Sequence, residues 1–237
     1  MSVPESRIPS TTLSETIAYL AAVDEEEAAV RVFLVRICRL ARRELARCDA
    51  VSVTYAGDDR FATLEADPEL VRAVDEAQYA DGEGPCLSAV RDGHPAGGEI
   101  DTSVNWPGFR QQSLALGLRS VVAVPLFTAA SRPVASLNLW SRSPAALEPL
   151  RAALMVLFDS HAPTTEWVAP GELDPGERKL AGGLRRALEL RTIINRAVGY
   201  LAAKHQVPLD EAFELLRSNA RSNGTDIART AGRLLIS

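Results

Sequence analysis

The chain has 237 residues, which is enough for one large domain or two small ones. Hydrophobic residues make up 46% of it and charged residues 24%, which excludes a disordered tail, a collagen-like chain and a continuous coiled coil. No run of about 18 apolar residues occurs, and residues 1–10 lack the basic start and apolar stretch of a signal peptide. We therefore expect a cytoplasmic protein that does not associate with a membrane.

Residues that could catalyse a reaction or bind a metal are few and widely spaced. Cys38, Cys48 and Cys86 form no C-x-x-C pair, and the three histidines lie far apart. Glycine-rich nucleotide motifs and the G-x-S-x-G nucleophile motif are absent from the sequence. We expect no metal, no cofactor and no enzyme activity. The enzymatic alternative is a thiol redox enzyme that uses Cys86, because a cysteine near a helix start can have a lowered pKa.

The net charge of −5 is unevenly distributed along the chain. Residues 1–177 carry 15 basic and 26 acidic side chains, a net charge of −11, whereas residues 178–237 carry 11 and 5, a net charge of +6. A basic segment of this size is typical either of a nucleic-acid-binding surface or of a solvated helical surface.

The first predicted elements are helices. Thr12 and Glu15 have the spacing of a helix-capping box, as do Asp24 and Glu27. The second pair precedes an apolar stripe at helical spacing over residues 30–48. A helix with this stripe is longer than is needed to cover one face of a small sheet. We therefore expect its extra length to pair with a second copy of the chain in a homodimer.

Two hairpins and further helices follow. Alternating apolar residues predict strands over residues 50–56, 60–66, 118–127 and 133–141. Helical patterns fall at residues 68–80 and 145–160. This order predicts an α+β fold in which an antiparallel sheet has helices on its faces.

The segment between the hairpins contains a distinctive series of motifs. GEGPC at residues 82–86 precedes a short helix, a polar loop with Trp106-Pro107, and the strand sequences SVVAVPL and PVASLNLW. Over residues 25–160 this series resembles the GAF domains of actinobacterial sensory regulators. The resemblance implies a sensor that receives a small-molecule or protein signal, with a pocket between the sheet and the loops of residues 81–106. Its candidate lining residues, for which core packing is the alternative role, are Cys86, Trp106, Asn138 and Trp140.

A proline- and glycine-rich segment then separates the acidic part from the basic part. Residues 161–177 contain three prolines and two glycines and are typical of a linker. Asp174, Pro175 and Glu177 give a helix-start signal at its end. We expect a helical segment at 1–24, a sensor at 25–160, a linker at 161–177 and a basic helical domain at 178–237.

The basic segment reads as three helices that share one small core. They are predicted at about residues 175–204, 209–220 and 226–235, with Thr225 as a helix cap and a bend at Gly182-Gly183. At 100° per residue, the apolar face of the first helix lies opposite an arginine line. The apolar face comprises Leu180, Ala187, Ile194, Val198 and Leu201, and the arginine line comprises Arg178, Arg185 and Arg196.

These helices resemble the ANTAR domain, the RNA-binding module of transcription antiterminators, over residues 180–236. The matching residues include Leu188, Arg191, INRAVGYL at 194–201, PLDEAF at 208–213 and LLR at 215–217. The resemblance implies that the partner is an RNA stem-loop in a transcript leader. With the charge pattern, it gives as candidate RNA-binding residues Arg196, Ala197, Gly199, Lys204, Arg217, Arg221, Arg229 and Arg233.

Departures from the family pattern occur at Val198, Ala202 and Gly224, and they bear on affinity and RNA choice. The alternative function is a DNA-binding regulator, because a basic three-helix bundle can also place a helix in the major groove.

Overall fold

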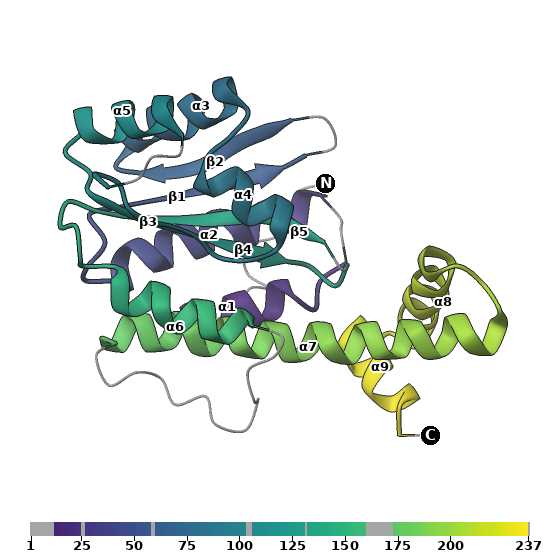
Figure 1. Ribbon diagram of the computed structural model, residues 1–237. Helices are drawn as coiled ribbons and strands as arrows, with labels where there is room; N and C mark the ends of the chain where they lie inside the picture. Colours follow the sequence, from purple (N-terminus) through teal and green to yellow (C-terminus); the bar gives the residue numbers. More distant parts are fainter. Residues whose placement is uncertain are drawn as a thin grey trace.

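The computed structural model describes residues 12–24, 27–57, 60–102, 106–130, 132–159 and 173–236. Its N-terminal part is built on an antiparallel sheet with the strand order β2-β1-β5-β4-β3 (Figure 1). The strands are β1 (Ala50–Ala56), β2 (Phe61–Asp67), β3 (Ala96–Glu99), β4 (Ser120–Phe127) and β5 (Pro133–Ser141). Both predicted hairpins are confirmed, whereas β3 was not predicted because its sequence, AGGE, has no alternation of apolar residues.

Helices cover both faces of the sheet, so the predicted α+β architecture is confirmed. One face packs against α1 (Leu13–Leu20), α2 (Glu27–Glu44), α6 (Glu148–Phe158) and the first half of α7 (Pro175–His205). The other face packs against α3 (Arg72–Asp81), α4 (Pro85–Asp92) and α5 (Pro107–Ala115), with a short 3-10 turn (Glu69–Val71) before α3. The chain continues into α8 (Leu209–Ser222) and α9 (Ile227–Leu234). We call residues 12–159 the sheet domain.

The pleat of β5 directs alternate side chains to different cores. Leu137 and Leu139 lie in the core beneath α1, α2 and α7. Asn138 and Trp140 point to the opposite face, beneath α3, α4 and α5, because successive strand residues alternate between faces. The candidate sensor residues on β5 therefore face the same helical layer as the GEGPC segment.

The predicted helix starts agree with the structure at two positions. At α1, Glu15 N donates to Thr12 Oγ1 (3.3 Å) and Thr12 N donates to Glu15 Oε2 (2.9 Å). At α7, Asp174 and Glu177 form the same reciprocal pair, with both distances at 2.8 Å. These side chains satisfy amide groups that have no partner inside the helix, which fixes where each helix begins.

Two other predicted caps have different outcomes. The Asp24–Glu27 pair cannot be compared, because the side chain of Glu27 is outside the described residues. The prediction of Thr225 as the cap of α9 was wrong. Asp226 caps this helix, since its Oδ1 accepts a hydrogen bond from Arg229 N at 2.7 Å.

The apolar stripe of residues 30–48 is covered by the same chain. It packs against α1 and α7 as well as the sheet, so that three partners share its length. All its members are buried except Phe33, which is partly buried: Val30, Leu34, Ile37, Leu40, Ala41, Leu45 and Cys48. The expectation that this stripe remains open for a second copy was therefore wrong.

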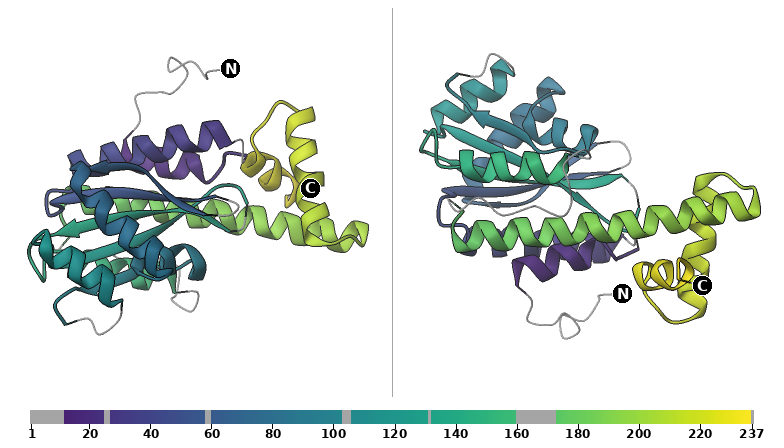
Figure 2. Two further views of the ribbon diagram at one scale, coloured as in Figure 1. Left: turned by 90° about the horizontal axis from the view of Figure 1, so that it is seen from above. Right: turned by 60° about the horizontal axis from the view of Figure 1, so that its bottom comes forward.

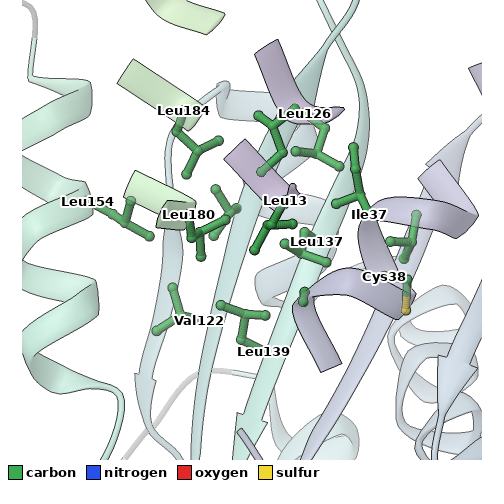
Figure 3. Packing of buried hydrophobic residues seen from close by; sticks show 14 of the residues in the cluster. Leu13, Ile37, Cys38, Val122, Leu126, Leu137, Leu139, Leu154, Leu180 and Leu184 are labelled. Atoms are coloured by element: carbon green, nitrogen blue, oxygen red, sulfur yellow. The ribbon is translucent and has the colours of Figure 1, made fainter. Parts of the chain in front are cut away.

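Helix α7 is continuous and passes through two cores. Leu180 and Leu184 of its first half meet Leu13 of α1 and Leu154 of α6 beneath the sheet (Figure 3). Ile194 and the residues after it belong to a separate core with α8 and α9. In both views of Figure 2, the end of α7 projects beyond the sheet domain and carries these two helices.

The packing of α7 changes two earlier expectations. The predicted bend at Gly182-Gly183 was wrong, because both residues lie inside the unbroken helix. The proposed linker lies mostly outside the described residues, and its last residues, Pro175–Glu177, form the first turn of α7. The packing changes between Ala187 and Ile194, well after the expected boundary at residue 178.

Candidate nucleic-acid interface

The second half of α7, residues 191–205, forms a compact core with α8 and α9, and we call this group the three-helix unit. Ile194, Leu201, Leu216 and Ala231 are buried in it. Ala197 is fully buried in the same core, so the expectation that RNA approaches it directly was wrong. Its small side chain instead lies where α7 packs against the other two helices.

One set of candidate residues lies on the exposed face of α7. Arg196, Tyr200 and Lys204 follow one another at intervals of four residues, and Gly199 lies three residues after Arg196, which places all four on one side of a helix. Tyr200 is 46% exposed, and the Nζ atom of Lys204 lies 5.6 Å from the centre of the Tyr200 ring. Tyr200 was not predicted as a binding residue, although an exposed aromatic ring between cationic side chains is a typical platform for an unpaired base.

A second set of arginines faces the sheet domain. Arg217 Nε and Arg221 Nη2 both donate to Asp24 Oδ2, at 2.8 and 2.7 Å. Asp24 lies between α1 and α2, so this contact joins segments that are almost 200 residues apart in the sequence. Asp24 was predicted only as a helix cap, and no local sequence pattern indicates this contact.

The remaining two candidate arginines lie on α9. Arg229 approaches Asp226 Oδ2 at 3.7 Å. Arg233 is exposed and makes no ion pair with any residue that the structure describes. Two of the family departures also have clear positions, since Val198 is buried in the core of the three-helix unit and Gly224 lies in the exposed turn before α9.

A cleft of about 910 Å³ separates α1 and the connection after it from α8 and α9. Its walls carry charges of both signs, from Asp24 and Asp226 as well as from Arg186, Arg221 and Arg229. The candidate residues are therefore divided between the outer face of α7 and a surface turned toward the sheet domain.

Several contacts fix α7 to the sheet domain between its start and its midpoint. Arg191 lies 4.3 Å from the centre of the Phe127 ring at the end of β4, and partial burial lowers the pKa of its guanidinium. Near the start of α7, Arg47 Nη1 lies 3.3 Å from Glu177 Oε2 and Lys179 Nζ lies 2.9 Å from a carboxylate oxygen of Glu44. The helix is therefore held at its start and at its midpoint.

Asn138, one of the candidate sensor residues, lies in a buried polar network beneath α3 and α4. Asn138 Nδ2 donates to Ser52 Oγ (3.1 Å) and Thr54 Oγ1 (3.0 Å), and it lies 3.4 Å from Asp75 Oδ1. Thr63 Oγ1 donates to the other Asp75 oxygen at 3.0 Å. Asp75 is fully buried, and this burial raises the pKa of its carboxyl to about 6 despite these hydrogen bonds.

Cys86 is held by a residue that the sequence analysis missed. Gln78 Oε1 accepts a hydrogen bond from Cys86 N, and Gln78 Nε2 approaches Cys86 Sγ, both at 2.9 Å. A Cβ at Gly84 would lie 2.2 Å from Gln78 Oε1, so the GEGPC glycine makes room for this side chain. The pKa of the Cys86 thiol is raised well above its usual range, mainly by burial and to a smaller extent by the negative charge of the nearby Asp75. The enzymatic alternative depended on a lowered thiol pKa at this helix start, and the raised pKa does not favour it.

Cys86, Trp106 and Trp140 belong to the same apolar cluster, together with Phe109 of α5. The Trp140 ring centre lies 5.7 Å from that of Phe109, which lies 6.2 Å from that of Trp106. Among the described residues, Trp140 Nε1 and Ser113 Oγ have no hydrogen-bond partner, although both side chains are buried. No group of three or more metal-ligating side chains occurs in the described ranges, nor does any helix long and apolar enough to cross a membrane.

Comparison with known proteins gives a match for the C-terminal helices. Residues 183–235 match the family model described as the ANTAR domain. No curated protein matches the chain.

Some solved structures show a distant likeness to more than half of this chain. The reduced form of fRMsr of Staphylococcus aureus is 12% identical with a TM-score of 0.43, covering 77% of this chain and 96% of that chain. The GAF domain region of a protein from Geobacter sulfurreducens PCA is 13% identical with a TM-score of 0.35, covering 68% and 93%. The chain thus carries an α+β domain on a five-stranded antiparallel sheet, and residues 183–235 are an ANTAR domain.

Proposed function

We propose that this chain is a cytoplasmic regulator in which a GAF-type sensor controls the binding of an RNA stem-loop by the ANTAR domain, causing transcription antitermination. The observation that carries the proposal is the ANTAR match on helices whose exposed side chains include Arg196, Lys204 and Arg233. Arginine and lysine on one small helical surface favour binding to a phosphate backbone.

The exposed face of α7 favours RNA with unpaired bases. Protein recognition of RNA sequence concentrates on loops, where bases can stack on aromatic side chains. Tyr200 offers such a ring between Arg196 and Lys204, and the neighbouring Gly199 leaves space beside it. A stem-loop would place phosphates near the cations and loop bases near the ring.

The sheet domain is proposed to receive the signal beneath α3, α4 and α5. Its motif series resembles GAF domains, and Trp140 Nε1 and Ser113 Oγ are buried polar atoms that a small polar molecule can satisfy. Thermal unfolding in the presence of a set of nucleotides, amino acids and organic acids tests this site. A ligand that stabilises the wild type and not Trp140→Phe supports it.

Helix α7 provides the physical connection between signal and RNA. Its first half shares a core with the sheet, and its second half belongs to the core of the three-helix unit. A change in the packing of the sheet domain is therefore transmitted to the three-helix unit without an intervening flexible segment.

The RNA proposal is tested with the full chain and labelled RNA hairpins of randomised loop sequence. Duplex DNA of equal length is the comparison, and binding is followed by fluorescence anisotropy over a series of salt concentrations. RNA should bind more tightly than DNA. Arg196→Ala should weaken binding and reduce the slope of log K against log salt by about 1, because one phosphate contact is lost.

The matched control is Arg185→Ala, which removes an arginine from the half of α7 that lies along the sheet domain. Arg185 is exposed and pairs with Glu189 at 2.7 Å. If both variants lost the same RNA affinity, binding would depend on the overall positive charge of the chain and not on a specific interface. Preference for duplex DNA would favour the alternative of a DNA-binding regulator.

A homodimer stays a prediction, and the stripe of residues 30–48 no longer supports it. Light scattering of the full chain at micromolar concentration checks this prediction. A monomer under those conditions would contradict it.

A further inference from the structure

Two arginines of the ANTAR domain converge on one carboxylate oxygen of the sheet domain. Arg217 and Arg221 are one turn apart on α8, and both reach Asp24 Oδ2, at 2.8 and 2.7 Å. Arg217 also contacts Glu214 Oε1 on its own helix at 2.9 Å. Asp24 is therefore the shared partner of the pair, whereas Glu214 engages one member of it.

The segment that carries Asp24 is positioned by the sheet domain. Ala129 N, in the connection between β4 and β5, donates to Val23 O at 3.0 Å. Ala22 and Ala129 also pack against the core of the three-helix unit. The position of Asp24 thus depends on two connections of the sheet domain that meet at the ANTAR domain.

Two guanidinium groups directed at one anionic oxygen form a donor arrangement that suits a phosphate as well as a carboxylate. A phosphate oxygen and the Asp24 oxygen cannot occupy the same position. The Asp24 charge also repels a phosphate that approaches the pair. The two anions therefore exclude each other at these arginines.

We propose that Arg217 and Arg221 form a phosphate-binding pair for RNA that Asp24 occupies in this conformation, so that the sheet domain competes with RNA for it. The inference rests on the proposed function and adds a means of control. A signal that shifts the connection between α1 and α2 frees the pair, and RNA that binds the pair displaces Asp24. Arg221, at 56% exposure, lies at the rim of the cleft where this exchange takes place.

The test compares the full-length wild type with Asp24→Asn for binding to labelled RNA hairpins with randomised loops. Exposed ion pairs each contribute a factor of about 1.4 to 5. Removing the competitor of both arginines should therefore raise the affinity by about 2- to 25-fold. Glu214→Gln is the matched control, because it makes the same change of charge next to Arg217 and leaves Asp24 in place.

A second comparison separates displacement from a general change in charge. In the Arg217→Ala/Arg221→Ala background, Asp24→Asn should leave RNA affinity unchanged, because the pair it would free is absent. A gain that persists in this background would overturn the inference, as would an equal gain from Glu214→Gln.

The outcomes also distinguish this inference from the proposed function. If no variant binds the hairpins, the proposed function fails and the inference fails with it. If RNA binds and Asp24→Asn has no effect, only the competition fails. A double-mutant cycle of Asp24→Asn and Arg221→Gln on urea unfolding should show coupling, and zero coupling would overturn the contact on which the inference depends.

Discussion

Helix α7 packs so closely against α1 that a side chain at Gly183 would collide with α1, whereas a side chain at the adjacent Gly182 would not. A Cβ at Gly183 would lie 2.7 Å from Ser14 Cα and 2.9 Å from Ser14 O, both backbone atoms of α1. A Cβ at Gly182 would find its nearest neighbour, Ser14 Oγ, at 4.0 Å. Gly183→Ala therefore requires the two helices to move apart, whereas Gly182→Ala does not.

The two substitutions gain the same helix propensity, about 1 kcal/mol for alanine over glycine. Gly182→Ala should therefore stabilise the protein by up to about 1 kcal/mol. Overpacking costs typically about 1–3 kcal/mol, so Gly183→Ala should be less stable than Gly182→Ala by about that amount. Its net effect on the free energy of unfolding relative to the wild type is then a loss of about 0–2 kcal/mol.

Urea unfolding of the full chain, followed by circular dichroism, measures both variants against the wild type. The adjacent positions share one helix, so propensity cancels in the comparison. If Gly183→Ala proved as stable as Gly182→Ala, α7 would not pack against α1 as described. The continuous coupling of sheet domain and ANTAR domain through α7 would then lose its structural basis.

Three further predictions concern buried and exposed side chains. Burial raises the pKa of Asp75 to about 6 from an ordinary value near 3.8, so the unfolded chain loses this proton first as pH rises. The stability of the wild type relative to Asp75→Asn should therefore fall by about 2 kcal/mol between pH 4 and pH 7, measured by urea unfolding. Cys38, Cys48 and Cys86 are all buried, so a thiol reagent at pH 7.5 should modify them slowly in the native protein and rapidly in urea. Tyr200→Ala should weaken hairpin binding by about 1–3 kcal/mol if the ring stacks on a base, whereas Tyr200→Phe should bind like the wild type.

Each of these predictions has a contrary result. If the difference in free energy of unfolding between the wild type and Asp75→Asn stayed constant with pH, the Asp75 carboxyl would be solvated in the folded protein. Rapid modification of Cys86 in the native protein would reopen the thiol-enzyme alternative. Equal binding by Tyr200→Ala and the wild type would leave the tyrosine as a surface residue without contact to RNA.

Local rules predicted the elements well because their signals lie within a few residues. The capping pairs at Thr12 and Asp174 and the alternation in β1 and β5 each depend on neighbours in the sequence. The fold class followed from their order. Strand β3 and helix α5 escaped prediction because neither contains a regular apolar pattern of sufficient length.

Periodicity identifies which face of a helix is apolar and gives no information on what covers it. The stripe of residues 30–48 and the apolar face of α7 were both predicted, whereas their partners were assigned incorrectly or left open. The same limit applies to charges. Arg217 and Arg221 were recognised as cations, but their contact with Asp24 depends on tertiary structure. Ala197 was predicted to contact RNA and is buried between helices. Its small side chain is compatible with either position, so the sequence alone could not distinguish them.

Binding of RNA by the ANTAR domain in cells can be measured by crosslinking the full chain to nucleic acid in living cells. The crosslinked nucleic acid is sequenced, and the crosslinked peptides are identified by mass spectrometry. We expect RNA with stem-loops from transcript leaders, and crosslinks within residues 183–235, including the exposed face of α7. Recovery of promoter DNA, or of RNA crosslinked to the sheet domain alone, would contradict this expectation.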